Sequence, residues 1–363
     1  MIRNAFLLCA SILLAAICAG CSQYVLPPAR PLTGIYPIPI LQNPTVDCTS
    51  ADTFAASALL IDPNFSPETK GSNYQPPTGS SFSSDFVRAD LKNAYTSAPP
   101  FLKAELCKLK GIFITQAPRS WGFRENTGNQ NPGCAVPTDT CGTYIALAYT
   151  LWNNGTTPAP TFHDYENSIA FDLLGAAGPQ YGFANPDTSA TTVLAVLAHE
   201  MGHILWWKRD VAHFACQTPP PGSKRIFRMI SWQSVADTPQ FHQFGAQQHP
   251  GLGVPGNVPS NASPDKDKVL GDIQALDYDS ATDDLEYIYG GDWASLFATV
   301  SPDEDFVETF VLRSLTSAVP SPLQNLQVLI PYNPSVDVVI KLYNNSITNL
   351  YKKASWIQTC LGY

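Results

Sequence analysis

Charged side chains are scarce in this chain, and basic ones are the scarcest. Only 14% of the 363 residues are Asp, Glu, Lys or Arg, and 21 Lys and Arg stand against 30 Asp and Glu, for a formal net charge of −9. A surface that binds nucleic acid needs clustered positive charge. The composition therefore predicts no nucleic-acid partner, and its 32 prolines and 23 glycines are typical of an exported protein rich in ordered loops.

Signatures of several enzyme classes are also missing. No Gly-x-Ser-x-Gly occurs, which argues against a serine hydrolase, and no P-loop is present to cradle nucleotide phosphates. No internal repeat is evident. The apolar run at residues 5–19 is shorter than the roughly 20 residues that a membrane-spanning helix needs.

The N-terminus instead has the features of an export signal. Arg3 precedes the apolar run, and Cys18-Ala19-Gly20-Cys21 stands at its end. This arrangement resembles the lipobox of bacterial lipoproteins, in which the signal is removed before a cysteine that receives a lipid. The resemblance implies a signal peptide over residues 1–20, a lipid on Cys21 and, from Ser22, an outer-membrane anchor. A plain secretory signal is the alternative.

Residues 21–48 are expected to form a Pro-rich tether between the lipid and a domain over residues 49–363. A strand-like arm lying across that domain is the alternative. The protein is therefore expected in the bacterial cell envelope, facing the periplasm or the outside.

Six cysteines remain after those of the N-terminal segment, and an even number in an exported chain indicates disulfides. Cys134 and Cys141 flank a short loop and are the expected local pair. The pairs Cys48–Cys107 and Cys216–Cys360 are the simplest completion, although six cysteines allow 15 connectivities.

The strongest functional signal is His199-Glu200-Met201-Gly202-His203. Histidines four positions apart lie on one face of a helix, so both imidazoles can reach one metal ion. Glu200 lies beside them, where it can take a proton from water that the metal activates. The surrounding run, residues 191–207, lacks proline and is apolar nearly all round, which predicts a buried helix. A core helix with two hydrogen-bonded histidines is the alternative interpretation.

The pentapeptide resembles the His-Glu-x-x-His motif of zinc metallopeptidases. The metzincin branch is excluded, because its third histidine would stand where Arg209 is and its glycine where Trp206 is. A helix expected over residues 301–315 carries Glu304-Asp305-Phe306-Val307-Glu308, which is similar to the second helix of gluzincin-type enzymes. That resemblance implies Glu304 as the third zinc ligand and Glu308 as the partner of His199.

Other ligand assignments stay open. Ser301 and Glu304 also form a capping-box pattern, in which Glu304 would close the start of its own helix. Asp303 and Asp305 are the alternative acidic ligands. The remaining histidines considered as outside candidates are His163, His213, His242 and His249.

The resemblance implies hydrolysis of peptide bonds with Glu200 as general base. Related enzymes often carry a tyrosine seven residues before the ligand glutamate, where this chain has Phe297. Tyr287, Tyr289 or His249 can substitute in stabilising the oxyanion. The acidic segment at residues 272–292 lacks the spacing of an EF-hand and is expected to be a solvated face, with calcium binding as the minority alternative.

The expected fold is an α/β (α+β) zincin-like domain. A small mixed sheet packs on the motif helix within an upper subdomain, residues 49–210. A mainly helical lower subdomain, residues 211–363, carries the third ligand and ends in helices near 336–343 and 347–356.

The leading functional hypothesis is a membrane-tethered zinc endopeptidase, with one catalytic Zn²⁺ and a peptide or protein substrate. A cell-wall peptide amidase would use the same site. From another class, the chain would be a non-catalytic surface lipoprotein that keeps zinc for binding.

Overall fold

The computed structural model describes residues 46–62, 77–117, 120–124, 143–174, 180–183, 187–232, 285, 288–299, 302–319, 326–329, 339–341 and 348–363. All of them belong to one unit, Ile40–Tyr363. The expected signal peptide, Cys21, most of the tether and the pair Cys134/Cys141 lie outside the described residues. The division at residue 210 stays a prediction.

The larger sheet has five strands in the order β2-β1-β3-β5-β4. The central strands β1 (Ala58–Ile61), β3 (Gly111–Thr115) and β5 (Thr143–Ala148) are parallel. The outer strands β2 (Gly79–Ser80) and β4 (Trp121–Arg124) are antiparallel to their neighbours. A mixed α/β architecture was expected and is confirmed.

Strands β3 and β5 are buried along their whole length and β1 is buried except at Leu60, as expected for parallel strands with both faces covered. Successive side chains alternate between the two faces. Ile112, Ile114 and Ile145 join the main core with the helices, whereas Phe113 and Tyr144 belong to a second cluster. The many β-forming residues of 143–152 predict a strand over that whole range. The strand instead ends at Ala148, and a 3-10 turn (Tyr149–Trp152) continues the chain.

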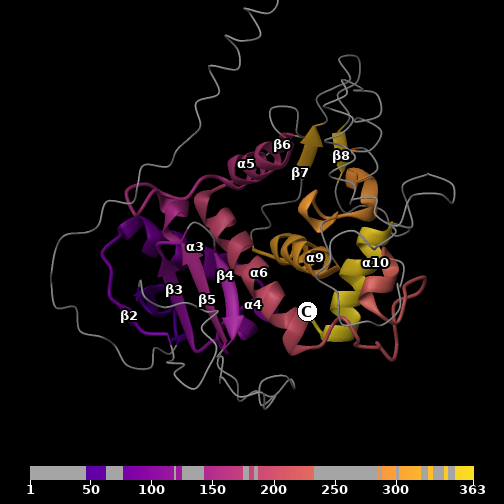
Figure 1. Ribbon diagram of the computed structural model, residues 1–363, viewed down its shortest axis with the longest axis horizontal. Helices are drawn as coiled ribbons and strands as arrows, with labels where there is room; N and C mark the ends of the chain where they lie inside the picture. The colour runs from indigo at the N-terminus through magenta and orange to yellow at the C-terminus, as the bar shows by residue number, and fades with distance from the viewer. Residues whose placement is uncertain are drawn as a thin grey trace, which may run out of the picture. The chain divides into compact units, whose positions relative to one another are not determined.

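The helix α6 (Ser189–Lys208) lies between this sheet and the C-terminal half, in contact with β4 and β5 on one side and α9 (Pro302–Thr316) on the other (Figure 1). Thirteen of its residues are buried, so the buried helix expected from the sequence is confirmed. A helix packed on both sides needs apolar residues all round rather than on one stripe. Its central place makes α6 the platform for the motif.

Shorter helices complete the N-terminal half. They are α2 (Ala51–Ala56), α3 (Asp85–Ser97), α4 (Pro100–Leu106) and α5 (Phe162–Leu174). The sequence predicts helices over residues 84–95, 101–109 and 162–174, and all three are confirmed.

A buried carboxylate ties α3 to the start of α6. Asp90 accepts hydrogen bonds from the Trp152 indole at 2.9 Å, the Ala159 amide at 3.0 Å and the Ser189 hydroxyl at 2.5 Å. Three donors satisfy a carboxylate that is only 5% exposed. This network anchors the N-terminal end of the helix that carries the motif.

The C-terminal half contains a small antiparallel sheet of β6 (Gln180–Phe183), β7 (Leu326–Leu329) and β8 (Val339–Lys341). The expected helix at residues 336–343 is therefore wrong. Its β-branched run, Val338-Val339-Ile340, favours a strand once β7 offers an edge to pair with. Helix α10 (Asn349–Trp356) is confirmed, and one further helical turn (Ile357–Leu361) follows it.

Before α9 in the sequence, the described residues include three short helical turns. They are Phe227–Ile230, Ile288–Asp292 and Phe297–Thr299. Among the described helices, none combines the length and the apolar character that crossing a membrane requires.

A buried ion pair joins α9 to α10. Lys353 Nζ lies 2.6 Å from Asp305 Oδ1, and both side chains are 0% exposed. The Trp232 indole donates to the other oxygen of Asp305 at 3.1 Å, and the Trp293 ring lies under the ammonium group at 4.4 Å. The ions are thus paired and hydrogen-bonded, as buried charges must be.

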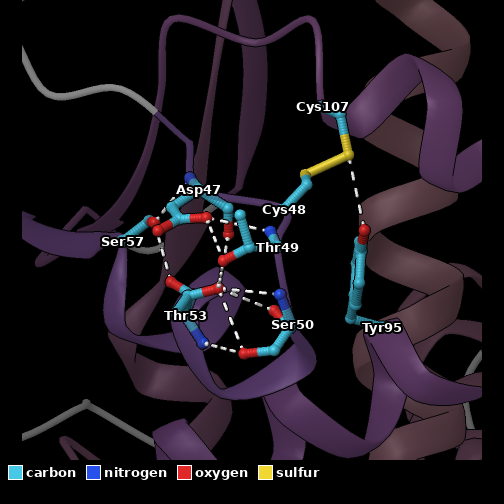
Figure 2. The surroundings of a disulfide bond; sticks show 8 residues. All are labelled: Asp47, Cys48, Thr49, Ser50, Thr53, Ser57, Tyr95 and Cys107. Carbon is cyan, nitrogen blue, oxygen red and sulfur yellow. Dashed lines mark hydrogen bonds between the residues drawn. A yellow bond between two sulfur atoms is a disulfide. The ribbon is translucent and has the colours of Figure 1, made fainter.

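Two disulfides fasten the ends of the described unit. Cys48–Cys107 ties the segment before α2 to the end of α4, and Cys216–Cys360 ties the loop after α6 to the turn after α10. In Figure 2, Tyr95 lies beside the first bridge, with its hydroxyl 3.4 Å from Cys107 Sγ. Both pairs are those expected from the sequence. Disulfides persist in oxidising compartments, so they indicate a location outside the cytoplasm.

Candidate metal centre

The two motif histidines point their outer nitrogens at one another. His199 Nε2 and His203 Nε2 are 3.2 Å apart, and both side chains are partly buried. The two rings are nearly perpendicular, with centroids 4.9 Å apart. This is the outcome of a four-residue spacing on α6, which places both side chains on one face.

Helix α9 brings a carboxylate to the same point. Glu304 Oε1 lies 3.6 Å from His203 Nε2, and Glu304 Oε2 lies 3.9 Å from His199 Nε2. His199, His203 and Glu304 form a group, the metal cluster, that can hold a metal ion. Ser301, the other half of the expected capping box, lies outside the described residues.

The spacing of these donors fits a tetrahedral ion. Zinc bonds of about 2.0–2.1 Å at tetrahedral angles put neighbouring ligand atoms about 3.3 Å apart. The 3.2 Å between the two imidazole nitrogens is close to that value, and one ligand atom from each of the three residues lies within 4.8 Å of the other two. A His₂Glu donor set also suits zinc among the common divalent ions.

A second carboxylate of α9 orients His199. Glu308 Oε1 accepts a hydrogen bond from His199 Nδ1 at 2.9 Å, and Glu308 Oε2 accepts from the Ser295 hydroxyl at 2.7 Å. When Nδ1 carries the proton, Nε2 keeps its lone pair for a metal. Ser295 had no sequence signal of its own, because its role depends on how the turn before α9 folds.

The neighbouring acidic residues are engaged elsewhere. Asp303 Oδ2 lies 3.7 Å from His203 Nδ1, the nitrogen that faces away from the cluster. Asp305 is committed to the buried pair with Lys353. His163 pairs with Asp187, and His213 pairs with Asp210, so neither joins the cluster. His242 and His249 lie outside the described residues.

Crowded carboxylates dominate the electrostatics of the cluster. Burial acts to lower the pKa of His199, but the hydrogen bond and charge of Glu308, with Glu200 and Glu304, raise it to about 9. Burial raises the pKa of Glu304 to about 7 against the opposing charges of the two histidines. A site that holds protons this strongly has an excess of negative charge, which a divalent cation can neutralise.

Glu200 directly follows His199 in the sequence and is only 5% exposed. Burial raises the pKa of its carboxyl group, while His199, His203 and a backbone hydrogen bond from Gly122 act in the opposite direction. Gly122 belongs to β4 and packs directly on α6. A Cβ there would lie 2.3 Å from the Glu200 carbonyl oxygen, so only glycine permits this approach.

A second glycine sets the distance between α6 and α9. A Cβ on Gly202 would lie 3.1 Å from Val307 Cα. Because Val307 stands between Glu304 and Glu308 in sequence, this contact brings both carboxylates within reach of the histidines. In the sequence alone, Gly202 is only an unspecified position of the motif.

The aromatic residues near the site differ in what they offer. The Phe297 ring centroid lies 6.1 Å from that of His199 and has no hydroxyl. Tyr289 is fully buried, and its hydroxyl accepts a hydrogen bond from the Leu296 amide at 3.2 Å. Tyr287 lies outside the described residues. Tyr165 of α5, not considered for this role from sequence, lines the cavity beside Glu200.

That cavity has a volume of about 570 Å³ and opens next to His199 and Glu200. Burial raises the pKa of the Tyr165 hydroxyl, and the charges of Glu166, Glu308 and Glu200 raise it further, so the group keeps its proton near neutral pH. A neutral phenol beside the metal cluster is a hydrogen-bond donor.

The chain has no match among protein-family models, curated proteins or solved structures.

Proposed function

We propose that this protein is a zinc-dependent endopeptidase, anchored to a bacterial envelope by a lipid on Cys21, in a zincin-like fold. The observation that carries the proposal is the convergence of His199 Nε2, His203 Nε2 and the Glu304 carboxylate, with Glu200 beside them. A structural zinc site has no need of a general base, whereas a hydrolytic site does.

In this proposal the three side chains hold the ion, and Glu308 keeps His199 in the required tautomer. When bound, zinc supplies Lewis acidity, which makes water more acidic and polarises a carbonyl group.

Glu200 acts as general base and then as general acid. It takes the proton of the attacking water and delivers it to the leaving amine. Its burial supports this role, because burial raises the pKa of the carboxyl group and so makes the carboxylate a stronger base. Tyr165 supplies the hydroxyl that Phe297 lacks and donates to the oxygen on which negative charge develops.

The edge of the larger sheet supports a peptide as the substrate. Strand β4 pairs with β5 on one side, and no described strand pairs with its other side. An extended peptide can add to such an edge by backbone hydrogen bonds. The backbone hydrogen bond from Gly122 to the Glu200 carboxyl group brings this strand close to the proposed general base.

The test is zinc content and cleavage of unfolded casein by the purified protein and three variants. We expect the parent to hold one zinc per chain and to cut. Glu200→Gln should keep zinc and lose at least about 100-fold in rate, and Glu304→Ala should lose both zinc and activity. Asp210→Asn, a matched change at an exposed carboxylate, should alter neither. A parent that binds no zinc would refute the proposal.

A non-catalytic binding module is the second candidate, favoured by the phenylalanine at position 297. It predicts a parent that holds zinc but cuts neither casein nor peptidoglycan-derived peptides. Cleavage of the latter alone would indicate the cell-wall amidase.

A further inference from the structure

The cavity beside the metal cluster has one feature that the proposed chemistry does not use. Glu166 of α5 lines it, together with residues from α6, α9 and the segment that follows β5. Most of the other walls are apolar, including Leu151, Ile169, Val196 and Val311. A carboxylate among apolar side chains is unfavourable unless it has a partner.

The acidic groups of the cavity wall are not equivalent. Glu308 is hydrogen-bonded to His199 and Ser295, and Glu200 lies beside the metal cluster. Glu166 makes no hydrogen bond or ion pair with the described residues. No Lys or Arg from the described part of the chain lines the cavity to balance it.

The surroundings of Glu166 disfavour its charge. Burial raises its pKa to about 8, and the negative charge of Glu308 adds to this, against the opposing effect of His199. An unpaired carboxylate in an apolar wall is costly, and a cation that enters the cavity relieves that cost.

We infer that this cavity receives the side chain of a lysine or arginine next to the scissile bond, with Glu166 as the group that pairs with its cationic end. The inference rests on the proposed endopeptidase function and names its substrate class. Apolar walls suit the alkyl stem of such a side chain, and the carboxylate suits its head. The volume falls within the usual range of about 300–1,000 Å³ for ligand pockets.

The first experiment measures binding and does not depend on cleavage. The probes are two hexapeptides that differ only in lysine or norleucine at one position, since norleucine has the same alkyl stem without the amine. Affinity is measured by calorimetry on the zinc-loaded full chain. We expect the lysine peptide to bind about tenfold more tightly to the parent, and Glu166→Gln to reduce this ratio to near one.

Asp164→Asn is the matched control. Asp164 lies on the same helix, exposed, and does not line the cavity, so this variant should keep the parental preference. Equal or tighter binding of the norleucine peptide to the parent would overturn the inference, and so would a lysine preference that survives Glu166→Gln.

The second experiment maps the cuts made in casein. Lysine or arginine should occupy one fixed position beside the scissile bond, and Glu166→Gln should shift that position towards apolar residues. If the parent cuts nothing, the endopeptidase proposal fails, while the binding ratio still decides the role of Glu166. If the parent cuts without a basic preference, the function stands and the inference falls.

Discussion

Glu308 shows how a side chain outside the three candidate metal ligands can orient one of them. Its two oxygens accept from His199 Nδ1 at 2.9 Å and from the Ser295 hydroxyl at 2.7 Å. Ser295 in turn accepts from the Ala298 amide at 3.1 Å, so the orientation of His199 is tied to the turn before α9. We therefore expect Glu308→Ala to weaken zinc binding by about 10- to 100-fold.

Competition with a chelator of known zinc affinity measures this loss. Glu308→Gln should fall between the parent and the alanine variant, because an amide oxygen still accepts from Nδ1–H. Ser295→Ala, which leaves the carboxylate in place, should have a smaller effect. Unchanged zinc affinity in Glu308→Ala would mean that His199 is oriented by other contacts.

The residues of the site were not equally accessible to sequence reasoning. His199, Glu200 and His203 follow from spacing on one helix, which is local information. Glu304 and Glu308 were named only through a resemblance, since no local pattern says which later helix meets α6. Glu166 and Tyr165 could not be found, because α5 joins the cavity only through tertiary packing.

At the scale of elements, the distance between α6 and α9 controls the cluster. Gly202 faces Val307, and an added Cβ would lie 3.1 to 3.3 Å from its Cα and both methyl groups. Gly202→Ala should therefore push α9 outward, cost about 1–3 kcal/mol of stability and weaken zinc binding. Urea unfolding and chelator competition measure the two effects.

Gly290→Ala is the matched control, because a Cβ there meets nothing within 4 Å. Adding Val307→Ala to Gly202→Ala should restore part of the zinc affinity, since it removes two of the three close contacts. A Gly202→Ala protein with parental stability and zinc affinity would show that the two helices separate freely.

The ion pair between α9 and α10 leads to a separate prediction. Lys353→Met removes the ammonium group that pairs with the buried Asp305 carboxylate, which should lower the free energy of unfolding by about 3–5 kcal/mol. Lys352→Met, a change at the half-buried neighbouring position, should stay within about 0.5 kcal/mol of the parent.

Combining Lys353→Met with Asp305→Asn should recover most of that loss, because neither of these two positions then carries a buried charge. Urea unfolding of the parent, the two single variants and the double variant measures these free energies. The folded double variant should also keep its zinc. Loss of zinc from it would instead indicate Asp305 as a ligand, the assignment that its contact with Lys353 argues against.

Element types were predicted best where the pattern was long and local. The helices α3 and α5 follow from the positions of their apolar residues, and α3 also from Ser84, which caps it through the Val87 amide. The strand β8 was mistaken for a helix, because its run is short and its partner β7 is a separate segment. Short apolar runs do not distinguish the two structures until a sheet edge is known.

For the molecule as a whole, the C-terminus is fastened to three other elements. The Tyr363 hydroxyl donates to Glu105 at 2.9 Å and accepts from Arg209 at 3.1 Å, while its main-chain oxygen accepts from Arg313 at 2.6 Å. These contacts join the last turn to α4, to the end of α6 and to α9. The mixed α/β class was predictable from sequence, whereas this convergence was not, because each partner is at least 50 positions away along the chain.

The two disulfides differ in whether the loop that each closes contains part of the metal cluster, and the effect of this difference can be measured. Cys216–Cys360 closes a loop of sequence separation 144 that contains α9, whereas Cys48–Cys107 closes one of 59 that contains none of the cluster. Chain entropy predicts that removing each pair as alanines lowers the free energy of unfolding by about 5 and about 4 kcal/mol respectively. Both variants should therefore unfold at lower urea concentrations than the parent.

Zinc binding should separate the two variants. Without Cys216–Cys360, the turn after α10 loses its tie to the loop that leaves α6, and α9, which α10 packs against, is held less firmly. We expect the zinc affinity of the folded protein to fall several-fold in this variant and to stay near the parental value without Cys48–Cys107. Competition with a chelator, without urea and with both variants fully folded, measures the two zinc affinities. Equal zinc affinities would mean that the packing of α9 on α6 around Gly202 holds the cluster by itself, with the disulfides acting only on the unfolded chain.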